Sequence, residues 1–255
     1  MRPGRYCFEP HRFSECIIDV SRLLLVIPCR DEAERIAGSL ELLAQQTQGL
    51  SLKVLLADNG SSDDLEETVA RLQGRFPFTL EYARVSSRPD KGIAIHRAWR
   101  SYASGCDLLG YCDADMAAAP EALVRAADLI AANKADVVVG DRYHTLSTLK
   151  GRSLVRALLS RSLSLLWRLL PRSGMRDPGC GLKMVSTACF RSAEFPTELG
   201  GFAFGARLTA RLHRMGYRVV AIPVLWQEGG RSRVPTFVAM GHYLATWFSL
   251  LRFWR

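Results

Sequence analysis

Short apolar runs that alternate with helix-like segments constrain the fold of this sequence more than any other feature. Residues 23–28 form a continuous apolar run with the length of a strand that is covered on both faces of a sheet. In residues 34–46, by contrast, the apolar side chains recur along one stripe of a helix. Alternation of this kind predicts an α/β fold with an open, mainly parallel sheet flanked by helices. The expected strands are residues 23–28, 52–57, 78–85, 107–112 and 137–140, and the expected helices are residues 34–46, a segment ending near residue 72, and residues 93–102 and 121–133.

Two aspartates, Asp113 and Asp115, follow the fourth apolar run. Residues two apart in an extended segment point to the same face, so both carboxylates can converge on one cation and on the anion that the cation carries. That geometry suits a diphosphate held by a metal ion. Pro28, Asp58 and Asp113 all lie at the carboxyl ends of expected strands, where open parallel sheets bind their ligands. The loops contain neither the glycine-rich dinucleotide motif nor the P-loop motif.

The charge of the chain indicates an anionic partner. Its 255 residues carry a formal net charge of +9, which favours phosphate groups, an acidic membrane surface or nucleic acid. Arginines are spread along the whole chain, without a lysine-rich tail or an aromatic-basic RNA-recognition octamer. We therefore expect phosphate groups and a membrane surface as partners, and no nucleic acid.

Cysteine usage and the N-terminus bear on the compartment. None of the seven cysteines forms a Cys-x-x-Cys pair and no His pair lies near them at zinc spacing, so reduced thiols of a cytoplasmic protein are expected. Residues 1–14 are polar and contain arginine, without the apolar core of a signal peptide. We expect residues 1–21 to be an N-terminal extension and residues 22–235 to form the main domain.

The second half of the chain is more apolar and more basic. Residues 151–170 predict one helix or a helix pair, which is either buried with its arginines at the rim or lies on a membrane surface. Residues 202–215 predict a helix and residues 217–223 a strand. Residues 236–255 predict a C-terminal amphipathic helix that either docks on the fold or lies in the membrane interface, which would place the protein peripherally on the inner face of the membrane. Its expected apolar face carries Phe237, Met240, Leu244, Trp247, Leu251 and Trp254.

Six short segments resemble glycosyltransferase family 2, and more narrowly its synthases that transfer a sugar to dolichyl or polyprenyl phosphate. The resemblance covers roughly residues 23–233, with the six segments in family order. Residues 26–32 are similar to the family's apolar-Pro-x-x-Asn-Glu, residues 58–61 to Asp-Asp-Gly-Ser, residues 90–94 to Gly-Lys-Gly-Ala, residues 113–115 to Asp-Ala-Asp, residues 140–143 to Gly-Ser-Arg-Tyr, and residues 177–183 to Asp-x-x-Cys-Gly-Phe-Lys.

The resemblance implies a GT-A fold, Rossmann-like and mixed but mainly parallel, over residues 22–235. It also implies an inverting transfer from a nucleotide-sugar donor, with Mg²⁺ or Mn²⁺ held by Asp113 and Asp115 to neutralise the leaving diphosphate. Uridine is the base expected from the family, and guanosine stays open. The implied nucleotide-sugar-binding residues are Pro28, Arg30, Glu32, Asp58, Lys91 and Asp113, and the implied catalytic residues are Asp115, Arg142 and Lys183.

A lipid phosphate is the implied acceptor. A phosphomonoester is largely ionised at neutral pH, so it needs a strong general base less than a sugar hydroxyl does. Guanidinium and ammonium groups match a phosphate, although each such group can also be a plain surface charge on a basic protein. The candidates for holding the acceptor phosphate are Arg142, Lys183, Arg231 and Arg233.

The chain departs from the family pattern on the acceptor side. Many relatives carry Phe-Ala-Phe-Asp-x-Glu where residues 202–207 place Gly205 and Arg207, so both acids are missing. Gly179 replaces a frequent Gln, and Asp31 replaces the Asn of the first segment. Two further hypotheses therefore stay open: a family 2 enzyme with a small soluble acceptor that Arg207 would bind, and a catalytically silent protein that binds nucleotide sugars.

Overall fold

The computed structural model describes residues 22–151, 153–170, 173–193, 195, 200–228 and 236–252. Several sequence predictions lie outside these residues. They are the N-terminal extension over residues 1–21, the acceptor candidates Arg231 and Arg233, and Trp254 on the C-terminal helix.

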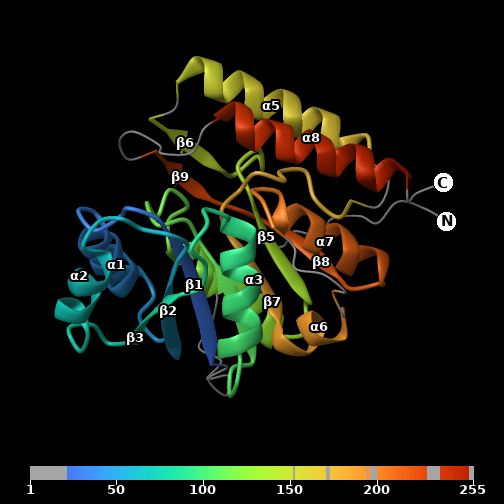
Figure 1. Cartoon of the computed structure of the whole chain (residues 1–255). Coiled ribbons are helices and arrows are strands. Elements are labelled where there is room, and N and C mark those ends of the chain that lie inside the picture. The colour runs from blue at the N-terminus through green and yellow to red at the C-terminus, as the bar shows by residue number, and fades with distance from the viewer. Residues whose placement is uncertain are drawn as a thin grey trace.

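A mixed, mainly parallel sheet forms the centre of the molecule, as predicted (Figure 1). Its strand order is β3-β2-β1-β4-β7-β5-β8, and every neighbouring pair is parallel except the two pairs that involve β7. A smaller parallel pair, β6 (Thr148–Lys150) with β9 (Leu225–Gln227), lies apart from it. The strands of the central sheet are β1 (Leu23–Cys29), β2 (Leu52–Asp58), β3 (Thr79–Arg84), β4 (Leu108–Tyr111), β5 (Val137–Asp141), β7 (Lys183–Ser186) and β8 (Val219–Pro223).

Helices cover both faces of the sheet. One core forms where α1, α2 and α4 pack on one face, and a second core, rich in aromatic side chains, forms where α3, α6 and α7 pack on the other. The β1 run explains this, because side chains alternate between faces and residues 23–27 are all fully buried. The helices are α1 (Ile36–Gln46), α2 (Leu65–Leu72), α3 (Lys91–Tyr102), α4 (Glu121–Ala131), α5 (Leu154–Arg168), α6 (Thr187–Ser192), α7 (Phe204–Arg214) and α8 (Thr236–Arg252).

The antiparallel strand β7 is absent from the sequence prediction. It has four residues, and it pairs with both β4 and β5. Such a short segment that starts with a lysine has no apolar run to mark it, so its strand character comes from the neighbours that it pairs with. Its position matters for the site, because it carries the loop of residues 177–182 to the carboxyl end of β4.

Helices α5 and α8 lie side by side above the carboxyl ends of the strands (Figure 1). The predicted helix or helix pair of residues 151–170 is the single helix α5, Leu154–Arg168. The indole of Trp247 donates to the Leu166 carbonyl at 3.0 Å, and Trp167 packs edge-on against Tyr243. The expected apolar face of the last helix is therefore partly correct: Met240 and Trp247 pack inward, whereas Phe237 is 80% exposed. Among the described residues, no helix is long and apolar enough to cross a membrane.

Candidate functional site

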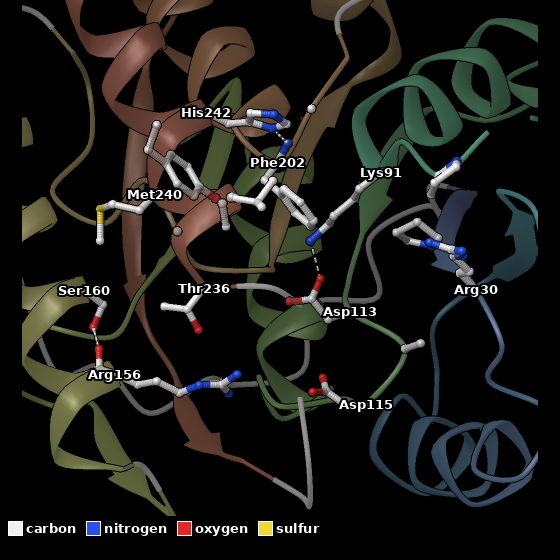
Figure 2. A pocket seen from close by; sticks show the side chains of 18 of the residues that line it. Arg30, Lys91, Asp113, Asp115, Arg156, Ser160, Phe202, Thr236, Met240 and His242 are labelled. Atoms are coloured by element: carbon white, nitrogen blue, oxygen red, sulfur yellow. Dashed lines mark hydrogen bonds and ion pairs between the residues drawn. The ribbon is translucent and has the colours of Figure 1, made fainter. Parts of the chain in front are cut away.

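A pocket of about 780 Å³ opens at the carboxyl ends of the strands, beneath α5 and α8. Its lining brings together segments that are far apart in the sequence: the loop after β1, the start of α3, the loop after β4, and one face each of α5 and α8. Figure 2 shows the lining side chains converging on this space. Of the residues implied by the resemblance, the pocket is lined by Pro28, Arg30, Glu32, Lys91, Asp113, Asp115 and Arg142.

The carboxylates of Asp113 and Asp115 lie on the same side of the pocket (Figure 2). The Lys91 ammonium forms a close ion pair with Asp113. Burial, and then the neighbouring Asp113 carboxylate, raise the pKa of Asp115. A Cβ atom on Gly181 would overlap Asp113 Oδ2, so glycine at this position leaves the space that the carboxylate occupies.

The residues around the carboxylate pair fit a divalent ion. The ion pair of the Lys91 ammonium with Asp113 shows that this carboxylate is placed to hold a positive group. No cluster of three His, Cys, Asp or Glu side chains able to hold a metal occurs in the described part of the chain. Magnesium does not need one, since it is commonly bound through one or two carboxylates while substrate phosphates and water complete its shell. Such a pair suits an ion that arrives with a diphosphate.

The loop after β1 forms one side of the pocket. Arg35 and Glu32 form a close ion pair, and Asp31 accepts hydrogen bonds from the Ser62 backbone and hydroxyl at 2.7 and 3.0 Å. Asp31 adopts a φ of +55°, a left-handed conformation that Asp tolerates better than most residues. Its bonds to Ser62 explain why Asp can replace the family's Asn here.

Asp58 lies outside the lining, although the resemblance implies it as a contact to the base. The side chain is completely buried, and Oδ1 accepts from the Gly60 and Ser61 backbone N–H groups at 3.1 and 2.8 Å. The Tyr82 hydroxyl donates to Oδ2 at 2.8 Å. Asp58 thus stabilises the turn that follows β2, and the next residue, Asn59, lines the pocket instead. Its role in base recognition stays a prediction.

Arg142 borders the pocket but its charge is balanced. Nε and Nη2 donate to the two carboxylate oxygens of Asp177 at 2.7 and 2.8 Å. Burial alone would raise the pKa of Asp177, but the guanidinium overrides that effect and holds it below the usual value. A Cβ atom on Gly179 would lie 2.8 Å from Arg142 Nη2, so the missing Gln gives room to this pair.

Lys183 is buried behind the pocket rather than lining it. Its ammonium donates to the Cys180 and Pro178 carbonyls at 2.8 and 3.3 Å, and burial lowers its pKa to about 8. Lys183 therefore holds the loop of residues 178–180 in this structure. Its predicted contact with substrate stays a prediction, which would require that loop to move.

Sequence reasoning missed Arg156 and Ser160 on α5. Both line the pocket, and the Arg156 side chain extends toward the carboxylate pair (Figure 2). Arg156 also lies 3.6 Å from Glu228. The arginine looked like one of several along a basic helix. Only the packing of α5 beside the pocket separates Arg156 from the exposed Arg161 and Arg168.

Known proteins are similar to the part of the chain that contains most of this pocket. Residues 24–191, which include the carboxylate pair and most of the pocket-lining loops, match the family described as glycosyl transferase family 2. The chain belongs to glycosyl transferase family 2. The chain is 26% identical over 234 residues to the glycosyltransferase AglD of Haloferax volcanii, covering 89% of this chain but 37% of that protein. It is also 26% identical over 212 residues to the polyprenol monophosphomannose synthase of Mycolicibacterium smegmatis, covering 81% of this chain and 78% of the synthase.

Solved structures confirm the predicted fold. Glucosyl-3-phosphoglycerate synthase from Mycobacterium tuberculosis, in complex with Mn²⁺, UDP and glucosyl-3-phosphoglycerate, has a TM-score of 0.67 to this family 2 chain. The two are 19% identical, and the match covers 94% of this chain and 85% of the synthase. The fold is therefore of the GT-A type.

Proposed function

We propose that this glycosyltransferase transfers a sugar, with inversion, from a nucleotide-sugar donor to a phosphate group of a polyprenyl-phosphate-type acceptor. One observation carries the proposal: a single pocket joins the carboxylate pair to Arg156 and to an apolar wall contributed by α5 and α8. A donor diphosphate suits the first part, an acceptor phosphate suits Arg156, and an isoprenoid chain suits the wall. The apolar wall consists of Leu159, Leu163, Val238, Ala239 and Met240.

The donor would bind through its diphosphate. Asp113 and Asp115 would hold Mg²⁺ or Mn²⁺, which when bound neutralises the charge that develops on the leaving diphosphate. Lys91 and Arg30 line the same side and would contact the phosphate oxygens. UDP-linked sugars are the first donors to test, and the structures of the synthase with Mn²⁺ and UDP support that choice.

An ionised acceptor also fits the acidic residues around the pocket. Glu32 is paired with Arg35, Asp113 with Lys91, and Glu228 with Arg156. His242 Nδ1 accepts from the Phe202 N–H at 3.2 Å, so a neutral ring there carries its proton on Nε2 and acts as a donor. Because each of these three carboxylates has a cationic partner, each is a weaker base for a sugar hydroxyl. A phosphate oxygen brings its own negative charge and needs no such base.

The outer surface of α5 and α8 suits the acidic face of a membrane. Neither helix contains an Asp or Glu, while Arg161, Arg168 and Arg252 are exposed along them. An apolar face beside basic groups favours the anionic cytoplasmic leaflet, so we place the enzyme peripherally on the inner face of the membrane. We call this the α5–α8 surface. Its exposed apolar residues are Leu154, Val155, Leu158, Leu165, Phe237, Val238 and Phe248.

A small phosphorylated metabolite is the second candidate acceptor. It is supported by the fold neighbour solved with phosphoglyceric acid, and the same Arg156 would bind such a phosphate. The structure gives less support to Arg207 as its ligand, because Arg207 lies outside the lining and donates to the Gly200 carbonyl. The α5–α8 surface has no role in this alternative. A silent nucleotide-sugar binder stays as the third reading.

Transfer of radiolabel tests the proposal directly. The full chain is incubated with labelled UDP- and GDP-sugars, polyprenyl phosphate and Mn²⁺ or Mg²⁺, with and without a chelator. We expect chelator-sensitive label in the organic phase. Nucleoside diphosphate release with all label in water would contradict the lipid acceptor, and no release from any donor would contradict the proposed transferase activity.

Flotation with phosphatidylserine vesicles tests the α5–α8 surface. The double variant Leu158→Ser with Phe237→Ser should bind the vesicles more weakly than wild type, and unchanged binding would contradict the membrane role.

A further inference from the structure

Asp90 and Arg207 hold the two ends of one peptide group. In the first turn of α7, Arg207 donates from Nη2 to the Gly200 carbonyl oxygen. The Gly201 N–H donates to Asp90 Oδ1 at 2.6 Å. The Gly200 carbonyl and the Gly201 N–H belong to the same peptide bond, so a cation holds its acceptor end and an anion holds its donor end. Such charge-assisted hydrogen bonds are roughly twice as strong as neutral ones.

The two glycines are required by this arrangement. A Cβ atom on Gly200 would lie 2.7 Å from Asp90 Oδ2. Gly201 has a φ of +80°, which side chains rarely adopt, and a Cβ atom there would lie 2.9 Å from His242 Nδ1. The close approach of Asp90 and of α8 to this peptide therefore depends on the absence of side chains.

The clamped peptide connects to the pocket on both sides. Asp90 Oδ1 also accepts from the Ile93 N–H at 2.9 Å, which caps α3 and fixes the backbone of the adjacent Lys91. Lys91 in turn contacts Asp113. On the other side, Phe202 donates to His242 of α8, and Phe202 lines the pocket opposite the carboxylate pair (Figure 2).

We propose that Asp90 and Arg207 are a pair of positioning residues that clamp the Gly200–Gly201 peptide and thereby set Lys91 and Phe202 for sugar transfer. The inference rests on the proposed function, and it gives Asp90, which lines the pocket, and Arg207, which does not, a role in positioning rather than in chemistry. It also accounts for the reversed charge at Arg207. The family pattern has an acid at the position of Arg207 and glycine at the position of Asp90. In this chain the acid is therefore Asp90, on the opposite side of the Gly200–Gly201 peptide from Arg207.

The electrostatic surroundings agree with a charge pair. Burial lowers the pKa of Arg207, and the nearby Asp90 carboxylate opposes that shift. A half-buried guanidinium without an anion nearby would be costly. Losing either member should therefore loosen the peptide and leave the other charge poorly balanced.

Hydrogen exchange tests the clamp without any substrate. In the full chain, Asp90→Ala and Arg207→Gln should each speed exchange of the Gly201 amide, read by mass spectrometry in a peptide that begins several residues before Gly200 and ends at residue 204. Arg211→Gln is the matched control, because Arg211 lies one turn further along α7 and donates to the Ala193 carbonyl at 2.9 Å. It should leave that peptide unchanged. Unchanged exchange at Gly201 in both test variants would overturn the clamp.

Kinetics test the positioning role. With the donor and acceptor found in the transfer assay, each variant should lower kcat by about 10- to 100-fold per folded molecule, because misplacing a contact residue by about 1 Å has effects of that size. The double variant should be no worse than the worse single one, and Arg207→Lys should recover part of the loss. Additive losses, or normal kcat in both single variants, would overturn the proposal. A wild-type protein that transfers no sugar would instead contradict the proposed function.

Discussion

The guanidinium of Arg142 and the carboxylate of Asp177 form a bidentate ion pair inside the protein, with both side chains buried. The Arg142 backbone N–H adds a third bond to the same carboxylate at 3.0 Å. The pair therefore ties the residue after β5 to the loop before β7, and both ends of that connection border the site. Arg142, which the resemblance implies as a substrate-binding residue, therefore also stabilises the fold.

Removing the anion should destabilise the fold strongly. Asp177→Ala leaves the Arg142 charge buried without its partner, and breaking a buried pair in this way costs about 3–5 kcal/mol. Urea unfolding followed by circular dichroism measures the loss. The double variant Asp177→Ala with Arg142→Met should be more stable than Asp177→Ala alone. A single variant as stable as wild type would show that the pair adds nothing.

Acid should weaken the same contact. The folded pKa of Asp177 is held below the ordinary value of 3.8, so folding favours the ionised form. Its contribution to the free energy of unfolding is full above the unfolded pKa and is lost as pH falls through the folded pKa. The urea midpoint of wild type should therefore fall more steeply below about pH 4 than that of Asp177→Asn. Parallel curves for the two proteins would contradict this.

Metal-dependent activity should require Asp115. Asp115→Ala removes one of two carboxylates that would hold the ion, so transfer and Mn²⁺ binding, measured by electron paramagnetic resonance, should both disappear while the circular dichroism spectrum stays unchanged. Asp128→Ala is the matched control, because Asp128 is exposed on α4 outside the pocket lining. Turnover retained by Asp115→Ala would exclude the metal role assigned to it.

The sequence predicted the sheet and the carboxylate pair because both rest on local patterns. Buried parallel strands are continuous apolar runs, and Asp113 and Asp115 follow one of them directly. Pro28 and Asp113 do meet at one edge, as the alternation indicated. Asp58 shows the limit of that reasoning: the end of a strand fixes where a residue lies, but only the neighbouring Tyr82 and Ser61 decide that its carboxylate faces inward.

The part of the pocket that we propose for the acceptor is harder to predict, because it depends on helix packing. Arg142 and Arg156 both line the pocket, but Arg142 is held by two short bonds to Asp177, 35 residues further along the chain, whereas Arg156 lies 3.6 Å from Glu228 and extends into the pocket. No spacing in the sequence distinguishes the two. The sequence of α5 likewise permits either burial or a membrane role; the packing of the helix pair shows which side chains are exposed, and the membrane role stays a prediction.

Acceptor affinity should depend on Arg156. Arg156→Gln removes the guanidinium that extends toward the carboxylate pair, so the KM for the phosphorylated acceptor should rise about tenfold or more while the donor KM changes little. Arg125→Gln on α4 is the matched control, since that arginine pairs with Glu121 at the surface. A rise in donor KM alone would place Arg156 on the donor side instead.

Restoring the family's acid at Gly205 should damage the fold rather than improve the enzyme. A Cβ atom at this position would overlap the Tyr111 hydroxyl and lie 2.6 Å from Lys183 Cδ. Both side chains are buried among close-packed neighbours, so Tyr111 or Lys183 would have to move to make room for the new atom. Gly205→Ala should therefore cost about 1–3 kcal/mol through overpacking, and Gly205→Asp more, because it also buries a carboxylate.

The opposite result is expected at Gly38, which provides the control for Gly205. Gly38 lies inside α1, and a Cβ atom there meets nothing within 4 Å. Gly38→Ala should stabilise the protein by about 0.5–1 kcal/mol, because alanine loses less backbone freedom on forming a helix. Urea unfolding of the two alanine variants side by side separates a packing effect from a helix-propensity effect. If Gly205→Ala were also stabilising, the missing acid would reflect a choice of acceptor rather than the space taken by Tyr111 and Lys183.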